Sequence, residues 1–145
     1  MQRFILSALL LFTTTPKTAA QNAAAVIRAE RNFAAHALEH GAKSAFLAYT
    51  DSSAVSMEGG EYGNALAQWR ARPDSKVLLQ WGPQFAAASA DGITGFTTGP
   101  YYMQIPGTDT LLATGQYTTF WLRNSRGEWK YLIDFGIQPN PLPPH

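Results

Sequence analysis

The chain of 145 residues contains no cysteine, and only 14% of its residues are charged. The lack of cysteine excludes disulfide frameworks, thiolate zinc sites and cysteine nucleophiles. The formal net charge is +1 and lysine and arginine form no cluster, which argues against a protein that binds the phosphate backbone of nucleic acids. With 46% hydrophobic and 12% aromatic residues, the chain is too apolar for intrinsic disorder, and its length corresponds to one domain.

The sequence also lacks an apolar run of about 20 residues, the length that a membrane-spanning helix requires. A shorter apolar run, Phe4–Phe12, follows the basic residue Arg3 and precedes small residues that end at Ala20. This order is typical of a secretory signal peptide. We therefore predict that residues 1–20 are cleaved after Ala20, with Ala25 as the alternative, and that the protein is periplasmic or secreted. After cleavage we expect no membrane contact.

Three helices are expected in the N-terminal half of the mature chain. They are residues 22–40, 44–49 and 65–72. Val26, Glu30 and Phe33 recur at helical spacing in the first helix. Gly41 can adopt the left-handed conformation that ends such a helix, and Asn64 is a suitable N-cap for the third. A strand is expected between the second and third helices, at residues 54–58, followed by a turn at residues 59–63.

The C-terminal half is rich in β-branched and aromatic residues, which favour strands. The expected strands are residues 76–81, 85–90, 93–104, 111–123 and 129–137. Their connections are short, so strands that follow one another are expected to pair antiparallel. Gly95, Gly99 and Gly115 lie inside these strands and indicate bulges or sharp bends that curl the sheet.

This order of elements predicts the fold class and the boundaries of the domain. Helices followed by antiparallel strands predict an α+β, cone-shaped fold, with N-terminal helices packed on a strongly curved antiparallel sheet. The domain is expected to span residues 22–137. Residues 138–145 form a proline-rich tail.

Two parts of the sequence carry a pattern of spaced aromatic residues and glycines. They are residues 25–49 and the closing pattern Gly115-x-Tyr117, Trp121-x-Arg123, Gly127-x-Trp129-Lys130 and Asp134-x-Gly136. Both resemble the nuclear transport factor 2-like superfamily, in its SnoaL-like and uncharacterised exported branches. The resemblance implies the cone-shaped fold, frequent dimerisation, and a pocket that serves isomerases, cyclases, dehydratases and proteins without activity. It selects no single function, because one fold hosts many.

Glu58 is the first candidate for catalysis. It ends the stretch 53–58, which is similar in placement to the strand that carries the carboxylate base of ketosteroid isomerases in this superfamily. Desolvation at the mouth of an apolar cone would favour the neutral carboxyl form, which suits proton transfer near neutral pH. The alternative is a solvated glutamate at the end of a strand, without any function.

Asp134 is the second candidate, because it lies in an apolar strand where a carboxylate needs a partner. It is either an acid in the pocket or a structural group bonded to Arg123, Lys130 or a backbone turn. Strict alternation places Asp134 on the face opposite Tyr131 and Ile133. If the aromatic face points inward, Asp134 lies outside the cone.

Aromatic side chains with polar tips are the candidate ligand-binding residues. They are Trp69, Trp81, Tyr102, Tyr117 and Trp121. Most aromatic residues of so small a domain belong to the core or to a dimer interface, and the strand register decides which of them face the pocket. His36 and His40 lie one helical turn apart, but two ligands do not make a metal site, so we predict no metal and no cofactor.

Three functions remain open. The first is an exported protein with a pocket for a small apolar ligand and no established catalysis. The second is a proton-transfer enzyme, an isomerase or lyase, in which Glu58 or Asp134 is the base and a tyrosine or tryptophan polarises a carbonyl. The third is an association module whose outer sheet face forms a homodimer or docks a partner.

Overall fold

The structure is a computed structural model of the chain and describes residues 18–138. Its helices are α1 (Ala19–His40), α2 (Ala42–Tyr49) and α3 (Ala65–Ala71). Its strands are β1 (Val55–Glu58), β2 (Glu61–Asn64), β3 (Leu78–Trp81), β4 (Phe85–Ala88), β5 (Thr94–Gln104), β6 (Leu111–Arg123) and β7 (Trp129–Ile137). Residues 1–17 of the predicted signal peptide and residues 139–145 of the predicted tail lie outside the described residues.

The ends of the helices follow from local capping signals. Thr18 and Gln21 form a capping box, so α1 begins at Ala19 and not at Asn22 as expected. Gly41, with φ of 87°, ends α1 in a backbone conformation that residues other than glycine rarely adopt. The side chain of Asn64 accepts a hydrogen bond from the backbone of Ala67 at 2.9 Å, which confirms the predicted cap of α3. No helix within residues 18–138 combines the length and hydropathy needed to cross a bilayer.

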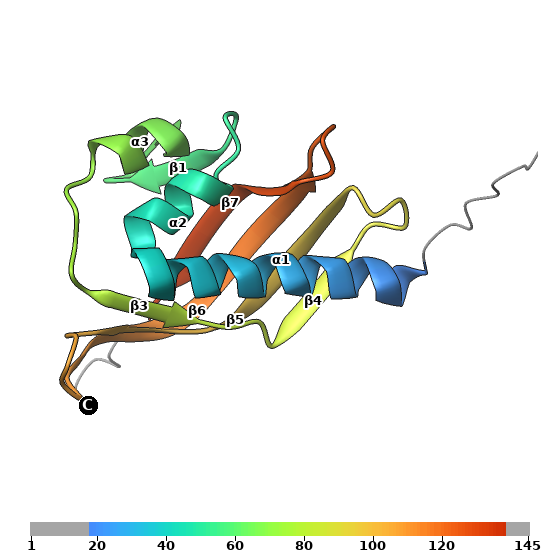
Figure 1. Cartoon of the computed structure of the whole chain (residues 1–145). Coiled ribbons are helices and arrows are strands. Elements are labelled where there is room, and N and C mark those ends of the chain that lie inside the picture. The colour runs from blue at the N-terminus through green and yellow to red at the C-terminus, as the bar shows by residue number, and fades with distance from the viewer. Residues whose placement is uncertain (1–17, 139–145) are drawn as a thin grey trace, which may run out of the picture.

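Five strands form the main sheet, in the order β3-β5-β6-β7, with β4 also paired to β5. All pairings are antiparallel. Helix α1 lies across one face of this curved sheet, and α3 and the β1–β2 hairpin lie near the end where α2 follows α1 (Figure 1). The predicted fold class, an α+β cone with N-terminal helices packed on a strongly curved antiparallel sheet, is confirmed.

Two details of the predicted strand order are wrong. β3 and β4 do not pair with each other, because both pair with β5 at successive positions along it. Between them the chain passes so close to Gly99 that a Cβ atom there would collide with the carbonyl oxygen of Gly82. The turn expected at residues 59–63 is shorter, since residues 61–63 belong to β2.

A β-bulge in β7 decides which side chains face the interior. Trp121 pairs with Tyr131, whereas the preceding Phe120 pairs with Ile133, so Leu132 is an extra residue on β7. Beyond the bulge the alternation is reversed, and Asp134 lies on the same face as Tyr131. The prediction that Asp134 lies opposite Tyr131 is therefore wrong. The register shifts of the sheet occur here and at Met103/Gln104, so the glycines, where bulges or sharp bends were expected, are not the sites of the bulges.

The core lies between α1 and the concave face of the sheet. Phe33 of α1 is fully buried and packs against several rings from α2 and the sheet. These rings are Phe46, Tyr49, Trp81, Trp121 and Tyr131, with centroids 4.8–5.9 Å from that of Phe33. A fully buried phenylalanine contributes roughly 1.5–3 kcal/mol, so this cluster holds the helix on the sheet.

Candidate functional site

A cavity of about 790 Å³ opens between the concave face of the sheet, α3 and the β1–β2 hairpin. Its wall is mostly apolar and aromatic. Residues that line it include Phe46, Trp69, Leu79, Trp81, Met103 and Tyr131. Asp134 and Arg72 are the charged residues among the described residues that line it. A cavity of this size and composition, with a few polar groups, has the properties of a small-molecule site.

Asp134 lies in the wall of this cavity and accepts a hydrogen bond from the hydroxyl of Thr119 at 2.6 Å. Burial raises the pKa of Asp134 to about 7; the hydrogen bond from Thr119 opposes this effect, and the charge of Glu30 adds to it. Near neutral pH the carboxyl group is therefore present in both its neutral and its ionised form.

The structural partners expected for Asp134 are bonded elsewhere. The guanidinium of Arg123 donates to the carbonyl of Gly127, and Lys130 donates to the carbonyl of Ala48. Asp134 thus has a structural hydrogen bond, but its partner is a neutral threonine. No cation neutralises its charge by direct contact within the described residues.

Tyr117 supplies a second polar group. Its side chain is buried and lines the cavity, and its hydroxyl has no hydrogen-bond partner among residues 18–138. Burial, and then the charge of Glu30, raise the pKa of Tyr117 above its ordinary value, against the opposing effect of the nearby Thr97 side chain, so the hydroxyl remains protonated. A buried hydroxyl without a partner costs about 1–3 kcal/mol, and an acceptor on a bound molecule would recover this free energy.

Glu30 of α1 is fully buried and was not among the predicted site residues. Its carboxylate accepts hydrogen bonds from the indole nitrogens of Trp81, at 2.5 Å, and Trp121, at 2.9 Å, and from the hydroxyl of Thr97. Burial raises the pKa of Glu30, against the opposing effect of these hydrogen bonds. The sequence did carry a signal for it, because Glu30 interrupts the apolar stripe of the first predicted helix.

The structure brings three of the five predicted aromatic residues to the cavity: Trp69, Trp81 and Tyr117. Tyr102 does not line it, because Tyr101 takes the inward position on β5 and leaves Tyr102 on the outer face, 42% exposed. Trp121 is buried in the core, 1% exposed, and its indole is bonded to Glu30.

Glu58 does not line the cavity, although its neighbours on β1 do. Its carboxylate forms an ion pair with Arg72, and both side chains are about half exposed. The guanidinium of Arg72 lies 4.3 Å from the ring centroid of Trp69, in a cation–π contact. Glu58 can therefore influence the cavity through Arg72, but it does not reach it directly.

Metal-ligating side chains do not converge in the part of the chain that the structure describes: no group of three or more histidine, cysteine, aspartate or glutamate residues could hold an ion there. The rings of His36 and His40 lie 4.7 Å apart on α1. A ring nitrogen of His36 forms a hydrogen bond with the hydroxyl of Ser44 at 3.1 Å.

No protein-family model matches the sequence, and no curated protein matches it either. Solved structures do resemble the chain. An NTF2-like protein of unknown function from Pseudomonas putida KT2440 has a TM-score of 0.66 and 9% identity, over 87% of this chain and 92% of that one. An NTF2-like protein with a cystatin-like fold from Novosphingobium aromaticivorans has a TM-score of 0.59 and 13% identity, over 83% and 84%.

An LEH-like epoxide hydrolase from M. tuberculosis is also similar, with a TM-score of 0.52 and 15% identity, over 87% of this chain and 83% of that chain. At such low identities these likenesses concern the fold alone. Proteins that share this fold differ in activity, so the function has to be argued from the cavity itself.

Proposed function

We propose, from the premise that this chain has the NTF2-like fold, that it binds a small and largely apolar molecule in the cavity of about 790 Å³. The polar end of the molecule accepts hydrogen bonds from Tyr117 and from the neutral form of Asp134. The observation that carries the proposal is the hydroxyl of Tyr117, which is buried in the cavity wall without a partner among the described residues.

The position of the two polar groups supports this proposal. Thr119 pairs with Asp134, and Tyr117 is two residues away on the same face of β6, so Tyr117 and Asp134 are diagonal neighbours. Their side chains therefore leave the sheet on the same face, at adjacent positions in the wall of the cavity. The surrounding indole and alkyl groups exclude water and strengthen such hydrogen bonds.

A pair of probes that differ in one oxygen tests the proposal. We expect the apolar ketone 1-tetralone to quench tryptophan fluorescence and to bind more tightly than the hydrocarbon tetralin. Tyr117→Phe should weaken the binding of the ketone by about 5- to 30-fold, which corresponds to a loss of about 1–2 kcal/mol for one hydrogen bond in a buried site, and should leave the binding of tetralin unchanged. Tyr102→Phe, outside the cavity, is the matched control. Failure of both probes to bind, or equal affinity for the two, contradicts the proposal.

Proton transfer at Asp134 is a second candidate function, and the pKa of about 7 favours it. An acid–base group is most effective when its pKa lies near the working pH. In this function Asp134 exchanges a proton at the carbon beside a carbonyl group, while Tyr117 donates to the carbonyl oxygen. Glu58 has no direct role in it, because its carboxylate is paired with Arg72 outside the cavity.

Exchange of the α-hydrogens of 1-tetralone in deuterium oxide, followed by NMR, tests this second function. We expect the wild-type protein to accelerate the exchange, Asp134→Asn to abolish the acceleration, and Glu58→Gln to preserve it. Acceleration that persists in Asp134→Asn would remove Asp134 from the mechanism.

We also propose that the protein is exported and that cleavage occurs after Ala20 rather than after Ala25. Asn22 supports the earlier site, because its buried side chain donates to the carbonyls of Ser89 and Ala90 and so fixes the turn between β4 and β5. Cleavage after Ala25 would remove this buried contact, whereas cleavage after Ala20 removes only the exposed cap that Thr18 provides for α1. We expect mass spectrometry of the exported protein to find Gln21 at the N-terminus, and an N-terminus at Met1 or Val26 would refute this site.

A further inference from the structure

A second cleft, of about 550 Å³, lies between α1, the end of α2 and the turn that joins β6 to β7. It shares no lining residue with the cavity described above. The residues that give it its chemical character are Arg28, Tyr49, Arg123, Glu128, Trp129 and Lys130. None of these belongs to the proposed ligand site.

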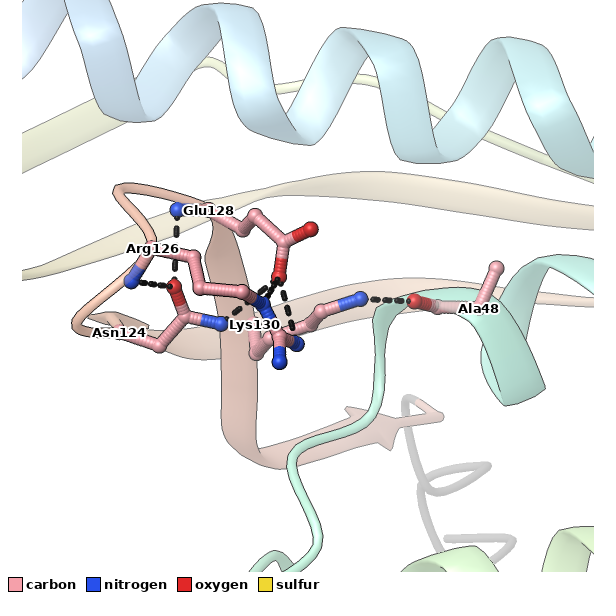
Figure 2. A network of polar contacts seen from close by, with 5 residues as sticks. All are labelled: Ala48, Asn124, Arg126, Glu128 and Lys130. Carbon is pink, nitrogen blue, oxygen red and sulfur yellow. Dashed lines mark hydrogen bonds and ion pairs between the residues drawn. The ribbon is translucent and has the colours of Figure 1, made fainter.

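The charge of this cleft is predominantly positive. Arg28, Arg123 and Lys130 contribute three cations, and Glu128 is the one acidic residue among the described residues that line it. One carboxylate oxygen of Glu128 already accepts hydrogen bonds from the guanidinium of Arg126, at 2.9 and 3.0 Å, and from the amide of Asn124 at 2.9 Å (Figure 2). Arg126 therefore compensates the charge of Glu128, and the three cations of the cleft keep an excess of positive charge.

Two of the cations are held in place by backbone carbonyls. Lys130 donates to the carbonyl of Ala48 at 2.6 Å, at the end of α2 (Figure 2). The Nε group of Arg123 donates to the carbonyl of Gly127 at 3.2 Å, which leaves its two terminal nitrogens available. These contacts hold the two cationic side chains in place at the rim of the cleft. The side chains therefore lose less conformational entropy when an anion binds.

Helix α1 completes the cleft. Arg28 and Asn32 lie one turn apart on the same face of the helix and both line the cleft. Small residues also line the cleft beside them, and these leave space between the helix and the sheet. They are Ala25, Ala29 and Gly92. The half-buried rings of Tyr49 and Trp129 form the aromatic part of the wall, against which a flat, apolar group can pack.

We propose that this cleft binds a small organic anion, whose carboxylate or phosphate group is held by Arg28, Arg123 and Lys130. The apolar part of the anion lies against Tyr49 and Trp129. A guanidinium group can hold two oxygens of a carboxylate or of a phosphate through parallel N–H···O hydrogen bonds, and two arginines line this cleft. The site is independent of the cavity that contains Asp134 and Tyr117.

Titration calorimetry of the full chain with three probes tests this proposal: benzoate, phenyl phosphate and the neutral benzyl alcohol. We expect one or both anions to bind and benzyl alcohol not to bind. Comparison of the two anions distinguishes a carboxylate ligand from a phosphate ligand. Affinity should fall when the salt concentration rises from about 0.05 M to about 0.5 M, because the contacts are exposed ion pairs.

Arg28→Gln and Arg31→Gln form a matched pair of variants, since both arginines are exposed on α1 and only Arg28 lines the cleft. We expect Arg28→Gln to weaken anion binding by roughly fivefold or more, and Arg31→Gln to change it by less than about twofold. Equal effects of the two variants would mean a diffuse surface charge and would overturn the proposal. So would a lack of binding by both anions, or binding that Tyr117→Phe abolishes.

Discussion

Glu30 and Asp134 are carboxyl groups in the interior, and each is bonded to the hydroxyl of a fully buried threonine. Thr97 donates to Glu30 and Thr119 donates to Asp134, while Thr97 and Thr119 pair across β5 and β6. A line of polar groups thus runs from α1 through two strands to β7. Burial raises the pKa of both carboxyl groups, and the negative charge of Glu30 raises the pKa of Asp134 further.

The raised pKa of Asp134 predicts a pH-dependent stability. The folded state binds a proton with a pKa of about 7, whereas the ordinary value is 3.8, so the folded protein carries more protons between these values. The neutral form of Asp134 therefore stabilises the folded state relative to the ionised form. This contribution to the free energy of unfolding is fully present below about pH 4 and is lost as the pH rises to about 7. Urea denaturation should show that the free energy of unfolding falls between pH 4 and pH 8 by roughly 2–4 kcal/mol less in Asp134→Asn than in the wild type. Parallel pH profiles of the two proteins would contradict this role of burial.

Glu30 is expected to be essential for the core. Glu30→Ala leaves the indole nitrogens of Trp81 and Trp121 and the hydroxyl of Thr97 without their acceptor, and it also creates a cavity. We expect a loss of about 3–5 kcal/mol in the free energy of unfolding, measured by chemical denaturation. Glu30→Gln preserves the volume and one acceptor, so its loss should be smaller; an equal loss would mean that the carboxylate oxygens are not what the indoles require.

At the level of elements, features that depend on a few neighbouring residues could be predicted from the sequence, and features that depend on how distant segments pair could not. The caps at Gly41 and Asn64 act within a few residues, so the C-terminal end of α1 and the start of α3 were predicted well, whereas the capping box at Thr18 was missed. The bulge at Leu132 depends on how β6 and β7 align, and no local pattern reveals it. The same limit applies to Tyr102 and Trp121, whose orientation follows from the register and from the packing of α1.

The close approach of two chain segments at Gly99 gives a prediction about the sheet. Gly99→Ala should destabilise the protein by about 2–4 kcal/mol, because its Cβ atom meets backbone, which cannot move as a side chain can. Gly82→Ala, on the opposite segment, is the matched control, since a Cβ atom there has no neighbour within 4 Å. Thermal denaturation compares the two. An equal effect of both substitutions would mean that the loss of glycine flexibility, and not the collision, matters.

For the molecule as a whole, the convex face of the sheet is notable for large apolar side chains. Phe85 is 70% exposed, Phe120 is 49% exposed, and Phe120 packs beside Phe96 with ring centroids 6.1 Å apart. Exposed apolar groups that gather on one face are typical of an interaction surface. The cavity lies on the other side of the sheet, so association through this face and ligand binding are compatible.

We predict that the convex face pairs two copies of the chain. Phe120→Glu would place two like charges in a symmetric, apolar contact, and it should shift the protein from dimer to monomer in sedimentation velocity. The variant should retain the affinity for 1-tetralone, because Phe120 does not line the cavity. A wild-type protein that stays monomeric at all concentrations would refute this prediction.

The inward position and the desolvation of Asp134 connect the bulge, the cavity and both proposed functions. An NMR titration that follows the side-chain carboxyl carbon of Asp134 measures the pKa of this group directly. We expect a midpoint near pH 7 in the free protein, and a change of that midpoint when 1-tetralone is added. A midpoint near pH 4, unaffected by the ketone, would mean that the carboxylate is in contact with solvent and would contradict the site proposed for this protein.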